Sequence, residues 1–244
     1  MPEEIPDGEP VPVAAIHPVS LVDYPGHIAS VVFLLRCNYR CPYCHNAQLV
    51  VPGRFRGSPL PWGEVLRELE ARRGFIDGVV ISGGEPLLTA GLSAALEELR
   101  ALGIAVKLDT NGSQPDALAA VLDRGLVDYV AVDVKAPWER YDEFTGVASD
   151  VERVRRTVDL VRCAAPDYEL RTTVAPTLTA EDVLVIADQI GRVRRYILQP
   201  FVARGGETLI DPAWASLEAL SAADLQRLWA ELRERFDDGG VRAG

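Results

Sequence analysis

Short apolar runs rich in β-branched residues alternate with longer segments of helical periodicity, and this alternation limits the folds open to the chain. The runs have the length of buried strands and cover residues 29–35, 77–82, 104–109, 128–134, 168–174 and 195–200. Helices are predicted over residues 62–73, 89–102, 114–125, 150–164, 179–191 and 221–236. Strands that alternate with helices build βαβ units and a parallel sheet, and right-handed crossovers curl such a sheet toward a barrel.

Six strand–helix units fall short of the eight that close a TIM barrel. We therefore expect an α/β fold, namely a partial, open (β/α)6 TIM-like barrel of parallel strands. Residues 1–19 are expected to be an N-terminal extension, residues 20–203 the barrel, and residues 204–244 a C-terminal loop and helix packed on it. Ligand-binding residues of such folds lie at the C-terminal ends of the strands, so motifs at those ends are the candidates.

The charge balance excludes some classes of function. A net charge of −11 argues against a general nucleic-acid-binding surface, which would be basic. No apolar run approaches the roughly 20 residues that span a bilayer, and the acidic, proline-rich first residues do not follow the pattern of a secretory signal. We therefore expect a cytoplasmic protein without membrane contact. The acidic surplus would also suit a high-salt cytosol, and that alternative stays open.

Three of the four cysteines follow the first predicted strand with the spacing C-x3-C-x2-C: Cys37, Cys41 and Cys44. Thiolates are soft ligands that favour zinc, copper(I) or iron–sulfur clusters. Three of them on one loop can hold three irons of a 4Fe–4S cube and leave the fourth iron open to a small molecule. The alternative is a zinc site that His45 completes. Cys163, on a predicted helix, is expected to be a small buried hydrophobic residue.

The second strand ends in Gly83, Gly84 and Glu85. Two glycines allow the backbone to approach a ligand closely and can expose amide N–H groups, while Glu85 adds a carboxylate. The third strand is followed by Asn111 and Gly112, a pair that is also typical of a simple turn.

Charged residues stand at the ends of otherwise apolar strands. Asp109 ends the third strand, and Asp133 and Lys135 end the fourth. Charge at such positions is costly unless it is paired or bound to a ligand, so an Asp–Lys ion pair and a ligand site are both open. Arg171 and Thr173 share one face of the fifth strand, where Arg171 meets an anionic ligand if that face lines the barrel, and water if it does not.

These motifs together resemble the radical S-adenosylmethionine (SAM) superfamily. Within it, the segments "SLVDYPGHIASVVF", "CNYRCPYCHN", "DGVVISGGEP", "LDTNG" and "DVKAP" are similar to the glycyl-radical-enzyme activases, and most similar to the anaerobic ribonucleoside-triphosphate reductase activating proteins. The resemblance runs from about residue 13 to about residue 203. It implies an oxidoreductase that reductively cleaves SAM at a 4Fe–4S cluster and generates a glycyl radical on a partner enzyme.

The resemblance also implies roles for individual residues. The cluster would be held by Cys37, Cys41 and Cys44, and the residues in contact with SAM would be Tyr43, Gly83, Gly84, Glu85, Asp133, Val134 and Lys135. Asp109 and Asp133 match positions that help to hold a monovalent cation in some relatives. An electron donor such as flavodoxin or ferredoxin would reduce the cluster, and no further catalytic side chain is implied.

The chain departs from the pyruvate formate-lyase activases at Val202, where those enzymes carry a histidine. The absence of another cysteine-rich insertion argues against a second cluster. Two alternatives remain open. One is a radical SAM enzyme that acts on a small molecule, such as a 7-carboxy-7-deazaguanine synthase. The other is a zinc-stabilised binding protein without catalysis.

Overall fold

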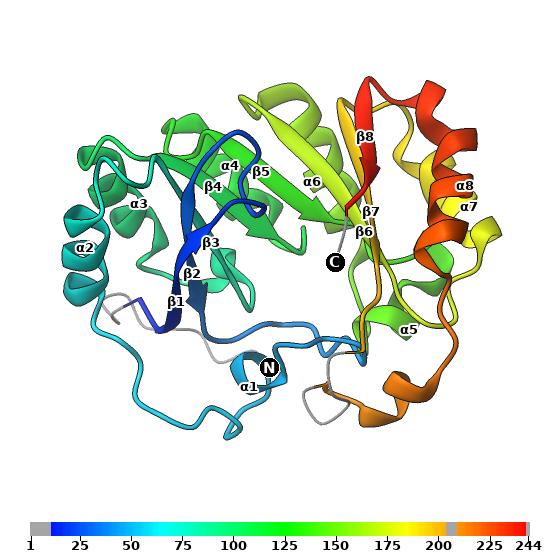
Figure 1. Cartoon of the computed structure of the whole chain (residues 1–244), viewed down its shortest axis with the longest axis horizontal. Helices are drawn as coiled ribbons and strands as arrows, with labels where there is room; N and C mark the ends of the chain where they lie inside the picture. The colour runs from blue at the N-terminus through cyan, green and yellow to red at the C-terminus, as the bar shows by residue number, and fades with distance from the viewer. Residues whose placement is uncertain (1–10, 204–208, 243–244) are drawn as a thin grey trace.

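The computed structural model describes residues 11–203 and 209–242 and places eight strands in one sheet, in the order in which they occur along the chain (Figure 1). The strands are β1 (Val13–Ser20), β2 (Ala29–Leu34), β3 (Gly78–Gly83), β4 (Ala105–Thr110), β5 (Tyr129–Asp133), β6 (Tyr168–Val174), β7 (Arg195–Pro200) and β8 (Asp238–Val241). The first pair, β1 with β2, is antiparallel, and every later pair is parallel. The predicted strands are confirmed as β2 to β7.

Two strands lie outside the prediction. β1 adds an antiparallel edge before β2, and β8 adds one more parallel strand after β7, so the six expected parallel strands become seven. The sheet therefore continues on both sides of residues 20–203, and the division at those residues stays a prediction. Within the described residues β1 and β8 are the two ends of the strand order and do not pair with each other, so the partial barrel is open.

The helices are α1 (Ala47–Val50), α2 (Trp62–Ala71), α3 (Leu92–Ala101), α4 (Pro115–Asp123), α5 (Tyr141–Thr145), α6 (Val151–Ala164), α7 (Ala180–Ile190) and α8 (Ala222–Leu232). Local sequence explains where α7 and α8 begin, because Thr179 and Ser221 form reciprocal capping boxes with Asp182 and Asp224. In Figure 1 the helices stand around the outside of the curved sheet, with α2 and α3 on one side and α7 and α8 on the other.

The two faces of the sheet differ in chemistry. On β4, Val106 and Leu108 belong to the large apolar core, whereas Lys107 and Asp109 point to the opposite face because side chains alternate along a strand. That opposite, concave face is called the inner face below. Its apolar part is a small cluster of buried residues that includes Tyr24, Val31 and Tyr129, and the rest carries charges.

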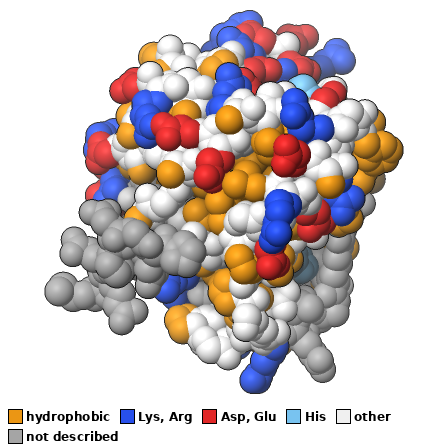
Figure 2. Space-filling model, turned by 90° about the vertical axis from the view of Figure 1, so that its left-hand side faces the viewer, with side chains coloured by type: hydrophobic (Ala, Val, Ile, Leu, Met, Phe, Trp, Pro, Cys, Tyr) orange, Lys and Arg blue, Asp and Glu red, His pale blue; other side chains and the backbone are white. Residues whose placement is uncertain are grey.

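The surface does not concentrate charge of one sign on the side of α2 and α3, where Figure 2 shows acidic and basic side chains interspersed. Ion pairs such as Arg72–Glu68 and Arg100–Asp128 account for part of this pattern. Cys163 is exposed on α6, so the expectation that it is buried was wrong: it lies on the solvent side of an amphipathic helix. Among the helices of residues 11–203 and 209–242, none combines the length and apolar character needed to cross a bilayer.

Candidate functional site

The cysteine loop, residues 35–46, runs from the C-terminal end of β2 to α1. Its backbone is tied to distant segments: the Arg36 N–H donates to the Leu49 carbonyl at 2.8 Å, and the Arg40 N–H donates to the Thr145 carbonyl at 2.7 Å. The Arg40 guanidinium also donates to the carbonyl of Cys37 at 2.6 Å. These bonds hold a loop that has no regular structure of its own.

The three thiols lie on this loop, with Cys41 buried and Cys37 and Cys44 partly exposed. Burial raises the pKa of Cys37 to about 12 and that of Cys41 to about 11, and it also raises the pKa of Cys44. The Cys37 sulfur accepts hydrogen bonds from the Tyr39 N–H at 3.4 Å and from the Asn111 side-chain amide at 3.6 Å. The thiols are therefore neutral without a bound cation, and Cys37 already has donors aimed at its sulfur.

The Gly-Gly turn packs directly on the start of the cysteine loop. Gly84 donates its N–H to the Leu34 carbonyl at 2.9 Å, and Glu85 donates to the Arg36 carbonyl at 2.8 Å. A Cβ atom on Gly84 would overlap the Arg36 carbonyl oxygen, and Gly83 has a φ of +116°. The expected exposure of the glycine amides was wrong for Gly84, because its N–H group bonds to a backbone carbonyl. The glycines bring β3 close to the cysteine loop.

Glu85 is completely buried. Its carboxylate accepts hydrogen bonds from the Leu87 N–H at 3.1 Å, the Thr110 hydroxyl at 2.8 Å and the Asn111 N–H at 2.6 Å. Burial raises the pKa of Glu85 to about 7, although these donors and Lys135 oppose the shift. The carboxylate thus joins the end of β3 to the end of β4.

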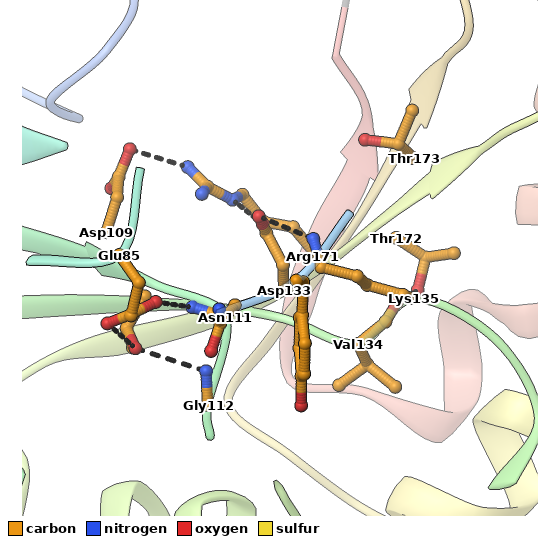
Figure 3. A network of polar contacts seen from close by, with 12 residues as sticks. Glu85, Asp109, Asn111, Gly112, Asp133, Val134, Lys135, Arg171, Thr172 and Thr173 are labelled. Carbon is orange, nitrogen blue, oxygen red and sulfur yellow. Dashed lines mark hydrogen bonds and ion pairs between the residues drawn. The ribbon is translucent and has the colours of Figure 1, made fainter. Parts of the chain in front are cut away.

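Arg171 bridges the carboxylates of two neighbouring strands (Figure 3). Its guanidinium lies 2.8 Å from Asp133 and 3.2 Å from Asp109. Each carboxylate also has a lysine partner: Lys107 pairs with Asp109 at 2.5 Å, and Lys135 lies 3.5 Å from Asp133. Burial opposes ionisation of Asp109, but Arg171 and Lys107 hold its pKa at about 2.

The predicted Asp–Lys pairing is therefore present, within a larger network on the inner face. Arg171 is itself buried, and its anionic partners include the carboxylates of Asp109 and Asp133. Lys107 is a member of this network that the sequence did not assign to the site. Arg171 was assigned to it only on the condition that its face of the strand lines the barrel. Thr173 has its hydroxyl 3.4 Å from the Gln199 side chain, at the same edge of the sheet. Val134 turns its side chain into the apolar core, while its carbonyl accepts a bond from Thr172 at 2.8 Å.

Tyr43 is buried in an aromatic cluster. Its ring centroid lies 6.3 Å from Phe144 and 5.8 Å from Trp214, and the Asp211 N–H donates to the Pro42 carbonyl at 3.0 Å. The segment after residue 208 thus supports the cysteine loop from outside, a role that the sequence had not indicated. His45 stacks on Phe201, with ring centroids 5.6 Å apart.

A groove of about 1740 Å³ lies against the cysteine loop, with Cys37 in its wall. It is lined by parts of residues 35–40, 48–55, 87–90, 113–114 and 147–153. The inner-face residues Asp109, Asp133 and Arg171 are not in its lining, so the groove approaches the loop from another side. Three arginines, Arg36, Arg40 and Arg153, contribute to its wall, against the single acidic residue Asp150.

The structure therefore brings the predicted motifs together at the C-terminal ends of β2 to β5. The added member is Asn111, expected only as a turn residue, which contacts Cys37 across 74 positions of sequence. The sequence signal that could have assigned Asn111 to the site was its place in the same "LDTNG" segment as Asp109. Val202 is exposed, and nothing in the described structure assigns it a role at the site.

Comparison with known proteins places the chain in a family. The radical SAM superfamily profile matches residues 31–190. A Methanocaldococcus jannaschii protein with the provisional name glycyl-radical enzyme activating enzyme is 34% identical over 197 residues, covering 78% of this chain and 79% of the relative. The 7-carboxy-7-deazaguanine synthase of Methanopyrus kandleri is 37% identical over 119 residues, or 41% of this chain and 46% of that protein.

Among solved structures, Streptococcus suis SuiB bound to S-adenosylmethionine superimposes with a TM-score of 0.64 at 15% identity, over 87% of this chain and 52% of that one. The chain thus spans about half the length of that structure, and the likeness concerns the fold alone. The match of the family profile extends from β2, through every motif of the site, to the end of α7. The chain belongs to the radical SAM superfamily.

Proposed function

We propose that this protein is a radical SAM activase whose substrate is a glycine in the chain of an anaerobic ribonucleoside-triphosphate reductase. The observation that carries the proposal is the similarity to a glycyl-radical enzyme activating enzyme over most of both chains. The open barrel supports the proposal. β1 and β8 are the two ends of the strand order and do not pair, and an unclosed sheet could admit a glycine-bearing loop of a partner protein.

Radical SAM enzymes use a 4Fe–4S cluster and SAM. The thiols fit such a cluster: three come from one loop, and the Cys37 sulfur accepts two N–H donors of the kind that support a thiolate. In residues 11–203 and 209–242, no three His, Cys, Asp or Glu side chains converge on a single ion, so the thiols fit the cluster by their chemistry and their shared loop, and their present spacing does not distinguish it from zinc. We assign Cys37, Cys41 and Cys44 to the cluster. When bound, the reduced cluster and SAM together supply the one-electron chemistry that removes a hydrogen atom from the partner's glycine.

The inner face offers charges of both signs to the amino and carboxylate groups of SAM. Asp133 and Lys135 lie at the end of β5, where the Asp133 side chain is 32% exposed and the Lys135 side chain 13%. Gly83 and Gly84 keep the end of β3 close to the cysteine loop, and Glu85 holds the end of β4 beside it. The contact of Tyr43 with the adenine, and a monovalent cation at Asp109 and Asp133, remain predictions of the resemblance.

The groove beside Cys37 is the proposed docking place of the electron donor, a flavodoxin or a ferredoxin. Its arginine-lined wall contrasts with the net charge of −11 of the whole chain. An acidic carrier would be steered toward such a wall, and its association rate would fall with added salt. The reducing conditions of the cytoplasm would keep the three thiols free to bind the cluster, and we propose that compartment for the protein.

The test is anaerobic reconstitution with iron and sulfide, followed by reductant, SAM and the reductase from the same organism. A 4Fe–4S cluster and a glycyl radical signal in electron paramagnetic resonance are the expected results. Cys41→Ala should lose both, whereas Cys163→Ala, at an exposed cysteine outside the loop, should keep both. Iron binding without any glycyl radical on the reductase would refute the assignment of the substrate.

A small-molecule substrate is the second candidate, favoured by the match to a 7-carboxy-7-deazaguanine synthase. SAM turnover that a pterin stimulates, with no radical on the reductase, would select this alternative. Zinc in place of iron in a colourless anaerobic preparation would instead select the non-catalytic binding protein.

A further inference from the structure

Asn111 extends its side-chain amide toward the first cysteine of the loop. The Nδ2 atom lies 3.6 Å from the Cys37 sulfur and 3.0 Å from the Asn38 Oδ1 atom. The residue is 6% exposed, so little water competes for these bonds. A buried amide of this kind must use its donors within the protein.

The surrounding bonds determine which way the amide points. The Asn111 Oδ1 atom accepts the N–H of Ser113 at 2.9 Å, so the oxygen is engaged away from the sulfur. Asn38 in turn donates its own amide to the Ser113 hydroxyl at 2.9 Å, which leaves its Oδ1 to accept from Asn111. Turning the Asn111 amide around would set its oxygen against the Asn38 oxygen and leave the Ser113 N–H without an acceptor. Only the observed orientation gives the Asn111 amide, the Asn38 amide and the Ser113 N–H group a hydrogen-bond partner each.

Glu85 holds the backbone from which this side chain extends. Its carboxylate accepts the Asn111 N–H at 2.6 Å and the hydroxyl of the preceding Thr110 at 2.8 Å. The buried carboxylate of the Gly-Gly-Glu turn therefore connects to the cysteine loop through Asn111. This linkage gives Glu85 a purpose that its lack of exposure would otherwise leave unexplained.

We propose that Asn111 is a positioning residue that donates an N–H to the cluster-bearing Cys37 thiolate and raises the reduction potential of the cluster. The inference rests on the proposed function, because it requires the cluster on Cys37. A reduced cluster carries one more negative charge than the oxidised one, so a donor at the sulfur stabilises the reduced form more. The donor makes the cluster easier to reduce, and Glu85 keeps it in place.

The experiment is a redox titration of the reconstituted protein, followed by electron paramagnetic resonance of the reduced cluster. Asn111→Ala removes the donor and should make reduction about tenfold less favourable, which is about 59 mV for a one-electron couple. Asn111→Asp keeps the size of the side chain, removes the donor and adds a negative charge, so its potential should fall further. Gln114→Ala is the matched control, since that nearby amide bonds to Arg153 and Ser113 and not to the sulfur. Its potential should equal that of the unmodified protein.

A second measurement needs no variant. With asparagine labelled by 15N in its side chain, pulsed resonance of the reduced cluster should show a coupling to an amide nitrogen. Unchanged potentials in Asn111→Ala or Asn111→Asp, or the absence of that coupling, would overturn the inference even if the unmodified protein forms a glycyl radical. Failure of the unmodified protein to bind a 4Fe–4S cluster would overturn both this inference and the proposed function.

Discussion

Replacing Glu85 by glutamine isolates what a fully buried carboxylate does to stability. The side chain has no exposed surface and accepts three hydrogen bonds, from Leu87, Thr110 and Asn111. Burial raises its pKa from 4.5 to about 7. Glutamine has nearly the same size and one carbonyl oxygen to accept bonds, but it does not titrate.

The sign of the effect follows from proton linkage. An acid whose pKa is higher in the folded state binds its proton more tightly there, so its contribution to stability is complete below pH 4.5 and is lost as pH rises through 7. At about 1.4 kcal/mol per pH unit, the rise in pKa corresponds to a loss of about 3 kcal/mol of unfolding free energy. The glutamine variant does not lose this amount.

Urea unfolding followed by circular dichroism, at several pH values from 5 to 8, measures the difference between the two proteins. The unfolding free energy of the unmodified chain should fall relative to Glu85→Gln by about 2.5 kcal/mol across this range, with most of the change between pH 5 and 7. Glu181→Gln, at an exposed position on α7, provides a control for the loss of one carboxylate. A difference between the unmodified chain and Glu85→Gln that does not change with pH would refute the reasoning.

Further substitutions test the packing and the charges of the site. Gly84→Ala places a methyl group on the backbone of the cysteine loop and should destabilise the chain by more than about 3 kcal/mol, whereas Gly63→Ala, where nothing lies within 4 Å, should not destabilise it. Arg171→Met leaves Asp109 and Asp133 each with a lysine as the remaining cationic partner and should cost about 3 kcal/mol. The exposed Arg155→Met should cost less than about 1 kcal/mol, and urea unfolding measures both variants. Trp214→Ala removes the outer support of the cysteine loop and should lower iron retention, measured by metal analysis after desalting.

The strands and helices of the barrel were predictable because their residues carry a period. β2 to β7 are apolar and β-branched, and the long helices show the spacing of one buried face. β8 has neither property: it contains Gly239 and Gly240, and its place depends on pairing with β7 and on packing under α8. A Cβ atom on Gly239 would overlap the Tyr196 carbonyl oxygen. β8 therefore pairs with β7 through a close approach of the two backbones, and the β-strand propensity of its residues does not predict this.

The membership of the site was predictable only in part. Its motifs end neighbouring parallel strands, and that topology places them at one edge of the sheet. The partners of each side chain were not predictable, since they depend on distances between strands. Arg171 reached two carboxylates on other strands, and Asn111 reached a sulfur on another loop.

The sequence alone determined the class of the protein. The spacing of its cysteines, the Gly-Gly-Glu turn and the strand–helix alternation are local patterns. They involve residues close together in the sequence, so they can be recognised without the structure. The tertiary structure alone decided that Glu85 is buried, that Gly84 packs on backbone, and that Asn111 donates to Cys37. Burial and hydrogen bonding depend on which groups the fold brings within about 3 to 4 Å, and residues far apart in sequence meet at that distance only after the sheet has formed.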